Sequence, residues 1–170
     1  STGYFGCRDK KGNFDQRSFE QKAKRDQVKM IEIKLSQGAK PGHGGMLLAP
    51  KVTQEIAKTR GIAMNQDCIS PAKHSEFSNP EELLRFVDKL RKLSGGKPVG
   101  IKLCVGHPWE IISIIKTMTT TKKYVDFITV DGAEGGTGAA PAEFTDHIGC
   151  PLKDAIVFID NALVGANLRD

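Results

Sequence analysis

Residues 99–141 read VGIKLCVGHPWEIISIIKTMTTTKKYVDFITVDGAEGGTGAAP, and this stretch decides the fold. Its first seven residues and residues 124–130 (YVDFITV) have the apolar, β-branched composition and the length of buried strands. Between them we expect a helix over residues 107 to about 118, because Pro at a first helical position is already set for the helix. The second strand runs into a glycine-dense loop, residues 131–141. This order predicts parallel strands whose functional residues gather beyond their carboxyl ends.

The same organisation extends toward both ends of the chain. Residues 28–35 (VKMIEIKL) have a strand pattern that stops at the turn-rich loop 36–45, and we expect a fourth strand around Gly61. The helices expected outside the central stretch cover residues 15–27 (capped by Asn13), 50–59, 80–93 (opened by Ser78-Asn-Pro and closed by Gly95-Gly96) and 151–163. The sequence therefore predicts an α/β fold, either half of a barrel or a small doubly wound sheet.

The length of the chain favours the partial barrel. A closed (β/α)₈ barrel takes roughly 250 residues, whereas this chain has 170 and stops after a helix, before the next strand. We therefore expect residues 1–170 to be a fragment of a barrel domain. The 25 basic and 20 acidic side chains leave a net charge of +5, and they are scattered along the chain. This distribution argues against nucleic-acid binding and is compatible with a small anionic ligand.

Cysteine and histidine spacing gives no metal motif. The four cysteines (Cys7, Cys68, Cys104 and Cys150) are dispersed without a CxxC pair, and the four histidines lack HxH or HxxxH spacing. We expect free thiols in a reducing compartment. No apolar run has the length of a membrane span and no signal peptide is evident, so a cytoplasmic location is expected.

Three features of the sequence bear chemistry. The loop 36–45 holds four glycines and Lys40, so it either lays backbone amides and a cation against an anion or serves as a long turn. Lys102 stands inside an apolar strand, where it needs either an anionic cofactor or an ion pair with an acid such as Asp131. Arg60 ends a helix, where it either complements the helix dipole or clamps a carboxylate.

Three ordered motifs carry a family resemblance. Residues 31–45 (IEIKLSQGAKPGHGG), 99–103 (VGIKL) and 130–141 (VDGAEGGTGAAP) resemble the FMN-binding synthase domain of glutamate synthase. The stretches GYFGCR (3–8), QDCISP (66–71) and KLCVGHP (102–108) are similar to the stand-alone, archaeal-type members. The resemblance covers essentially all 170 residues.

The resemblance implies a TIM barrel, here truncated, that holds FMN at its mouth. There 2-oxoglutarate and ammonia form an imine that the reduced flavin converts to L-glutamate. By motif, Lys102 is similar to the lysine at the N1/O2 edge of the flavin, and Asp131, Gly135, Gly136 and Thr137 to the loop beside it. Lys34, Gln37, Lys40 and Arg60 match the residues that bind 2-oxoglutarate, with Lys40 assigned a catalytic role and Arg60 the clamping of a carboxylate.

The chain also departs from the family pattern. His43 and Met46 replace an acidic residue and a glutamine of the family. The cysteines of the family's 3Fe–4S cluster, the last strands with the main FMN phosphate loops, and the glutaminase domain lie outside residues 1–170. We therefore expect these residues alone to bind FMN weakly or not at all, and exposed barrel edges to favour homo-oligomers.

The resemblance also implies partners, which are glutaminase and electron-donor domains or subunits, with ammonia supplied free or from glutamine. The alternatives are a non-catalytic barrel fragment and another FMN-dependent barrel oxidoreductase.

Overall fold

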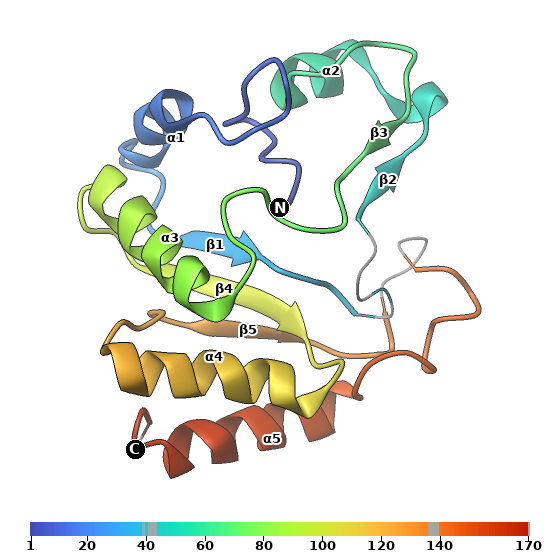
Figure 1. Ribbon diagram of the computed structural model, residues 1–170. Coiled ribbons are helices and arrows are strands. Elements are labelled where there is room, and N and C mark those ends of the chain that lie inside the picture. The colour runs from blue at the N-terminus through green and yellow to red at the C-terminus, as the bar shows by residue number, and fades with distance from the viewer. Residues whose placement is uncertain (39, 41–43, 136–139, 170) are drawn as a thin grey trace.

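Three parallel strands form the central sheet of the computed structural model, which describes residues 1–38, 40, 44–135 and 140–169 (Figure 1). The strands are β1 (Ile31–Lys34), β4 (Val99–Cys104) and β5 (Ile128–Asp131), in the order β1-β4-β5. Lys34 lies opposite Lys102 in the register of the first pair, and Cys104 opposite Asp131 in that of the second. The expected parallel arrangement of these three strands is confirmed, and the mixed α/β fold is compatible with part of a (β/α) barrel.

Three long helices pack against this sheet and against one another. They are α3 (Pro80–Leu93), α4 (Pro108–Thr121) and α5 (Leu152–Gly165), with α4 lying between the other two in Figure 1. All three confirm the expected helices: α3 has the expected bounds, and the ends of α4 and α5 are shifted by one to three residues. Their apolar faces meet the sheet in one core. Its largest fully buried side chains are Leu84, Val87, Val99, Ile101, Ile111 and Met118.

The two faces of the sheet differ in polarity because strand side chains alternate. Ile33 and Ile101 are buried in the core under the helices. On the opposite face the Thr129 hydroxyl donates to the Glu32 carboxylate at 2.6 Å, from β5 to β1 across the intervening strand. Lys34 and Lys102 project from this same face, closer to the carboxyl ends of the strands. One face therefore stabilises the fold, and the other carries the polar chemistry.

Local capping explains which helix boundaries the sequence predicts correctly. The Asn79 side chain accepts from the Glu82 amide at 2.9 Å at the start of α3, as expected. The cap expected at Asn13 is wrong. Asp15 caps α1 (Gln16–Ala23) instead, because its carboxylate accepts from the first-turn amides of Arg17 and Ser18.

A small antiparallel pair, which the sequence analysis missed, lies apart from the main sheet (Figure 1). It consists of β2 (Met46–Leu47) and β3 (Cys68–Ile69). The fourth strand expected around Gly61 is wrong, because Gly61 adopts a left-handed conformation (φ 66°) that ends a helix.

The helix expected over residues 50–59 is divided. A 3₁₀ turn, η1 (Ala49–Lys51), precedes α2 (Gln54–Arg60), and the Thr53 side chain between them accepts from the Ile56 amide at 3.3 Å. Since Thr53 is extended there, it caps a new helix and does not continue the earlier turn. Arg60 is the last residue of α2, before the left-handed Gly61.

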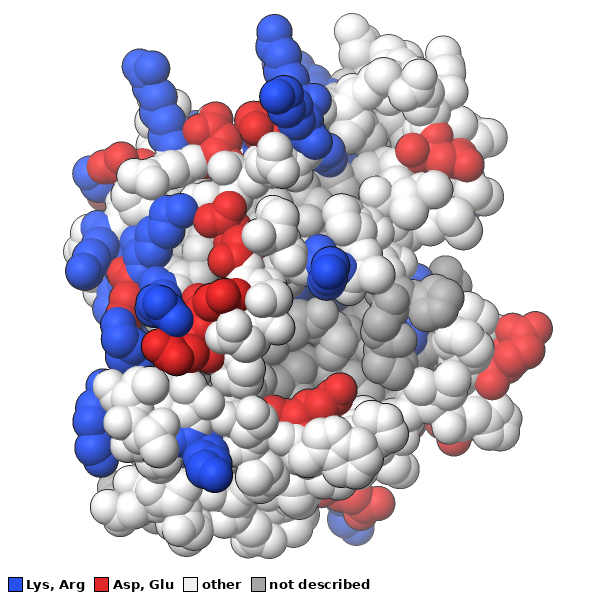
Figure 2. All heavy atoms as spheres, in the orientation of Figure 1, with Lys and Arg blue, Asp and Glu red and all other residues white. Residues whose placement is uncertain are grey.

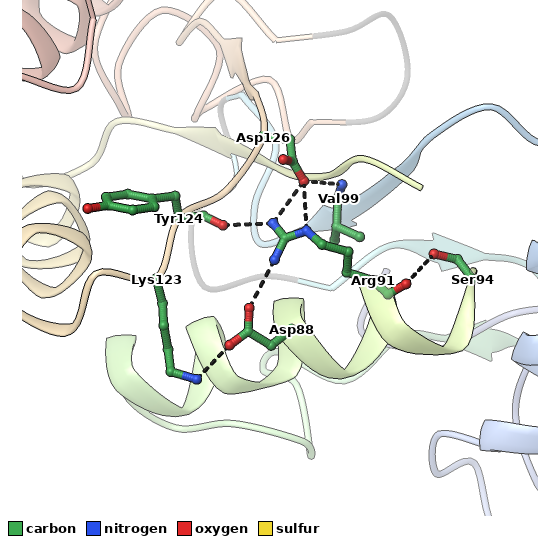
Figure 3. Close-up of polar contacts among 7 residues, drawn as sticks. All are labelled: Asp88, Arg91, Ser94, Val99, Lys123, Tyr124 and Asp126. Carbon is green, nitrogen blue, oxygen red and sulfur yellow. Dashed lines mark hydrogen bonds and ion pairs between the residues drawn. The ribbon is translucent and has the colours of Figure 1, made fainter. Parts of the chain in front are cut away.

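A polar network ties α3 to the start of β5 (Figure 3). Arg91 donates to the Asp126 carboxylate at 2.8 Å and to the Tyr124 carbonyl at 2.8 Å, and Asp126 also accepts from the Val99 amide at 2.7 Å. The strand expected from residue 124 therefore begins only at Ile128.

Charges of both signs are interspersed over the face of the molecule drawn in Figure 2. Lys and Arg side chains alternate with Asp and Glu over the region of α1 and α3, without a broad patch of one sign. This face therefore lacks the basic stripe typical of a nucleic-acid-binding surface.

Candidate functional site

The predicted site residues of the three strands meet at the carboxyl end of the sheet. Lys34 is the last residue of β1, Asp131 is the last of β5, and Lys102 lies between them on β4. The Lys102 Nζ atom is 3.1 Å from Asp131 Oδ2. The Gly38 amide donates to the same carboxylate oxygen at 3.3 Å. Asp131 thus connects Lys102 with the loop that follows β1. Of the two interactions expected for Lys102, an anionic cofactor or an ion pair with an acid, the ion pair is present.

Lys34 is held in the same cluster by a side-chain amide. Its ammonium group donates to Gln37 Oε1, and both residues are partly buried. Burial lowers the pKa of Lys34 below its usual value, and the charges of Lys102 and Lys40 lower it further, while Asp131 opposes them. A negatively charged ligand close to Lys34 would therefore stabilise its ammonium form.

Arg60 approaches the cluster from α2. Its guanidinium carbon lies 4.9 Å from the centre of the Phe5 ring, and its Nη1 atom is 3.8 Å from Cys68 Sγ. Among the described residues, no carboxylate forms an ion pair with Arg60. The positive charge of Arg60 is thus supported by a ring and a sulfur atom, neither of which neutralises it.

Two adjoining cavities collect these residues. The first, of about 270 Å³, is lined by Lys34, Gln37 and Arg60, and no Asp or Glu occurs among its described lining residues. The second, of about 580 Å³, is lined by Lys102 and Asp131 with glycine-rich backbone. Gln37 lines both cavities. Lys34 and Arg60, predicted to bind the substrate, therefore line one space, and Lys102 and Asp131, predicted to bind the cofactor, line the other. Lys40, also predicted for the substrate, is not among the described lining residues of either cavity.

Glycines allow the loops around the second cavity to approach each other closely. A Cβ at Gly38 would lie 1.8 Å from the Gly132 carbonyl oxygen, so a larger residue would force the two loops apart. Gly135 lines the same cavity with a left-handed backbone (φ 69°) that suits glycine. Gly136 and Thr137, the other two residues predicted for this loop, lie outside the described residues, as does His43.

Comparison with known proteins now decides the family. All residues from 1 to 170 match a family model described as a conserved region in glutamate synthase. The chain belongs to the glutamate synthase family. It is 44% identical over 167 residues to the glutamate synthase large subunit-like protein YerD of Bacillus subtilis, covering 98% of this chain and 31% of that protein.

Two further glutamate synthases extend the comparison. The archaeal glutamate synthase [NADPH] of Methanocaldococcus jannaschii is 42% identical over 142 residues, which cover 82% of this chain and 27% of the relative. The ferredoxin-dependent glutamate synthase of Antithamnion sp. is 32% identical over 143 residues, which cover 84% of this chain and 9% of the relative. The chain thus spans about a third or less of the length of these relatives.

Sequence reasoning missed two residues that support this candidate site. His74 is buried and its Nε2 atom lies 2.9 Å from the Lys34 carbonyl oxygen, so Nε2 carries the proton and donates. The Nδ1 atom of the resulting neutral ring then accepts from the Tyr4 hydroxyl at 3.0 Å. Phe5, under Arg60, is the other support. No local spacing signals either residue, because each is distant in sequence from the group it contacts.

The described residues include no group of three or more His, Cys, Asp or Glu side chains arranged to hold a metal ion. Within the same part of the chain, no helix has the length and apolar character needed to cross a membrane.

Proposed function

We propose that this chain is part of the FMN-binding barrel of a glutamate synthase that reductively aminates 2-oxoglutarate to L-glutamate. The observation that carries the proposal is the 270 Å³ cavity, which holds Lys34 and Arg60 without a carboxylate among its described lining. Its volume is slightly below the roughly 300–1,000 Å³ typical of drug-sized ligands, so it suits a small dianion. Two cations in a cavity whose described lining holds no carboxylate favour a dicarboxylate.

We propose the second cavity as the site of the FMN ring system. Its volume of about 580 Å³ is sufficient, and the close approach of Gly38 and Gly132 leaves bare backbone along its wall. Lys102 is the cation that lines it among the described residues. A single cation suits the ring edge, where reduction adds negative charge, and we assign Lys102 to that edge. When bound, FMN supplies the electrons that reduce a carbon–nitrogen double bond.

The side chains of the first cavity would bind and orient the dicarboxylate. The planar Arg60 guanidinium suits bidentate binding of the carboxylate remote from the reacting carbon. Lys34 and Gln37 would hold the reacting end toward the second cavity, because Gln37 lines both spaces. We assign Lys40, in the loop that follows β1, to polarise the 2-oxo or imino group, as the family resemblance implies.

The reaction needs ammonia and electrons from other components. We propose that glutaminase and electron-donor domains or subunits supply them. Ammonia would enter either directly or from glutamine.

Binding of 2-oxoglutarate to the full-length protein tests the proposal. Isothermal titration calorimetry should give a dissociation constant that Arg60→Ala raises by roughly tenfold to a hundredfold, because a hydrogen bond to a charged group contributes about 1.5–3 kcal/mol. Reoxidation of the reduced flavin should depend on 2-oxoglutarate together with ammonia. Reoxidation by a nucleotide or isoprenoid substrate would favour a different FMN-dependent oxidoreductase, and absence of any turnover would favour a non-catalytic module.

A further inference from the structure

A tight turn at residues 4–7 sends two neighbouring aromatic rings in different directions. Tyr4 has a left-handed backbone (φ 46°), which is uncommon for a residue with a side chain, and its ring is buried in the core. The turn is closed by a hydrogen bond from the Cys7 amide to the Tyr4 carbonyl at 2.8 Å. Phe5 is only partly buried and lines the substrate cavity. The strained residue therefore anchors the turn while the next ring reaches the site.

The Phe5 ring contacts Arg60 at the cavity wall. The Arg60 guanidinium carbon is 4.9 Å from the ring centre, within the distance at which a cation is attracted to an aromatic face. A second guanidinium, that of Arg8, lies over the same ring at 5.5 Å. The Nε atom of Arg8 is buried without a hydrogen-bond partner among the described residues.

Gly3 fixes where the ring lies. A Cβ placed on Gly3 would come within 2.5 Å of Phe5 Cζ and 2.6 Å of Cε2. The ring is therefore packed directly over the backbone of Gly3. Since Phe5 reaches this position through a flexible side chain, a methyl group at residue 3 would displace the ring without requiring the backbone to move.

We propose that Phe5 is a positioning residue that holds the Arg60 guanidinium ready for the substrate carboxylate. This inference rests on the proposed function. A free arginine side chain loses substantial rotamer entropy when it binds a ligand. A ring that already confines the guanidinium, without neutralising it as a carboxylate would, reduces that loss and leaves the charge available. Phe5 thus acts on substrate affinity through Arg60.

Calorimetric titration of 2-oxoglutarate into full-length variants tests the inference. Phe5→Leu removes the aromatic face but keeps an apolar side chain, and it should raise the dissociation constant roughly threefold to tenfold. Phe5→Tyr keeps the ring and should restore binding to within about twofold of the parent. Gly3→Ala should weaken binding in the same direction, because it displaces the ring. Gly165→Ala is the matched control, since a Cβ there meets no atom within 4 Å, and it should leave binding unchanged.

A double-mutant cycle separates positioning from general packing. In an Arg60→Ala background, Phe5→Leu should cause no further loss of affinity, because the residue through which it acts is gone. An equal loss in both backgrounds would overturn the inference and assign Phe5 to packing or to Arg8. Parent-like binding by both Phe5→Leu and Gly3→Ala, with Arg60→Ala impaired, would overturn it while the proposed function stands. If the parent protein fails to bind 2-oxoglutarate, the proposed function itself fails.

Steady-state kinetics add a second readout. Phe5→Leu should raise the KM for 2-oxoglutarate and leave kcat close to that of the parent. A loss confined to kcat would contradict a role in holding the substrate carboxylate.

Discussion

Replacing Arg91 by Ala should destabilise the fold at the edge of the sheet remote from the site. Arg91 joins three acceptors: the Asp126 carboxylate, the Tyr124 carbonyl and the Asp88 carboxylate at 2.9 Å (Figure 3). Asp126 in turn accepts from the Val99 amide, so one guanidinium connects α3 to the amino ends of β4 and β5. Alanine would remove every one of these contacts of Arg91.

The expected loss is about 2 kcal/mol of unfolding free energy. Hydrogen bonds to charged groups contribute roughly 1.5–3 kcal/mol when shielded from water, whereas exposed ion pairs contribute about 0–1 kcal/mol. The Arg91 side chain is 28% exposed and that of Asp126 is 41% exposed, so we discount each contact toward the lower range. For a domain of this size, 2 kcal/mol corresponds to a decrease in Tm of roughly 4–8 °C.

Thermal unfolding followed by circular dichroism measures this effect, with Arg85→Ala as the control. Arg85 lies on the same helix and forms an ion pair with Glu81 at 3.0 Å, with both side chains 59% exposed. The control removes an arginine from α3 with the same change in helix propensity, but we expect it to cost about 0.5 kcal/mol or less. Equal Tm decreases for the two variants would refute the reasoning that the network stabilises the fold.

The pH dependence of the Arg91 effect supplies an independent check. Burial disfavours the charged form of Asp126, but hydrogen bonds from Val99 and Arg91 outweigh burial and hold its pKa below the usual 3.8. The stabilisation is therefore complete above about pH 3.8 and is lost as the pH falls through the lower, folded-state pKa. The difference between parent and Arg91→Ala should narrow in that acidic range, and a constant difference would contradict the role of the charged Asp126.

The remaining predictions concern the site. Lys102→Met should lower the midpoint potential of bound flavin by roughly 30–60 mV, whereas Asp131→Asn should raise it, because it frees the Lys102 charge. Spectroelectrochemistry measures both potentials. Shifts of the same sign in the two variants would refute the assignment of Lys102 to the flavin edge. Arg60→Ala should raise the KM for 2-oxoglutarate by roughly one to two decades with little effect on flavin reduction, whereas Lys40→Ala should also lower kcat. Steady-state kinetics like those of the parent for Arg60→Ala would mean that Arg60 serves only as a helix-end residue. Burial lowers the pKa of His74 below 6.5, so the His74 ring binds a proton more readily in the unfolded chain than in the folded one. The free energy of unfolding should therefore be full above about pH 6.5 and decrease below it. Denaturant unfolding of His74→Gln should lack that decrease.

The sequence predicts most of the main sheet because the decisive signals there are local. Residues 99–105 contain an apolar run of strand length, and they form β4 almost to the residue. Asn79 and Pro80 mark the start of α3, since a cap and a first-turn proline act within one helical turn. Prediction fails where local signals compete, as at Asn13 and Asp15, or where a glycine ends a helix, as at Gly61.

Local sequence signals do not predict the pairing of the short strands β2 and β3. β2 and β3 are two residues long each, and they form only because residues 46–47 and 68–69 come together across an intervening helix. Such short runs have no periodicity to read. Their pairing depends on contacts that form only when the whole chain folds.

The candidate site divides in the same way. The sequence by itself determined that Lys102 must find a partner, because an ammonium in an apolar strand is costly to bury, and its motifs identified the family. Only the tertiary structure decided that Asp131 is that partner, that Gln37 lies between two cavities, and that Phe5 contacts Arg60 across 55 positions of sequence. The physical reason is that residue type sets what a side chain requires, whereas which groups meet that requirement depends on strand register and loop packing.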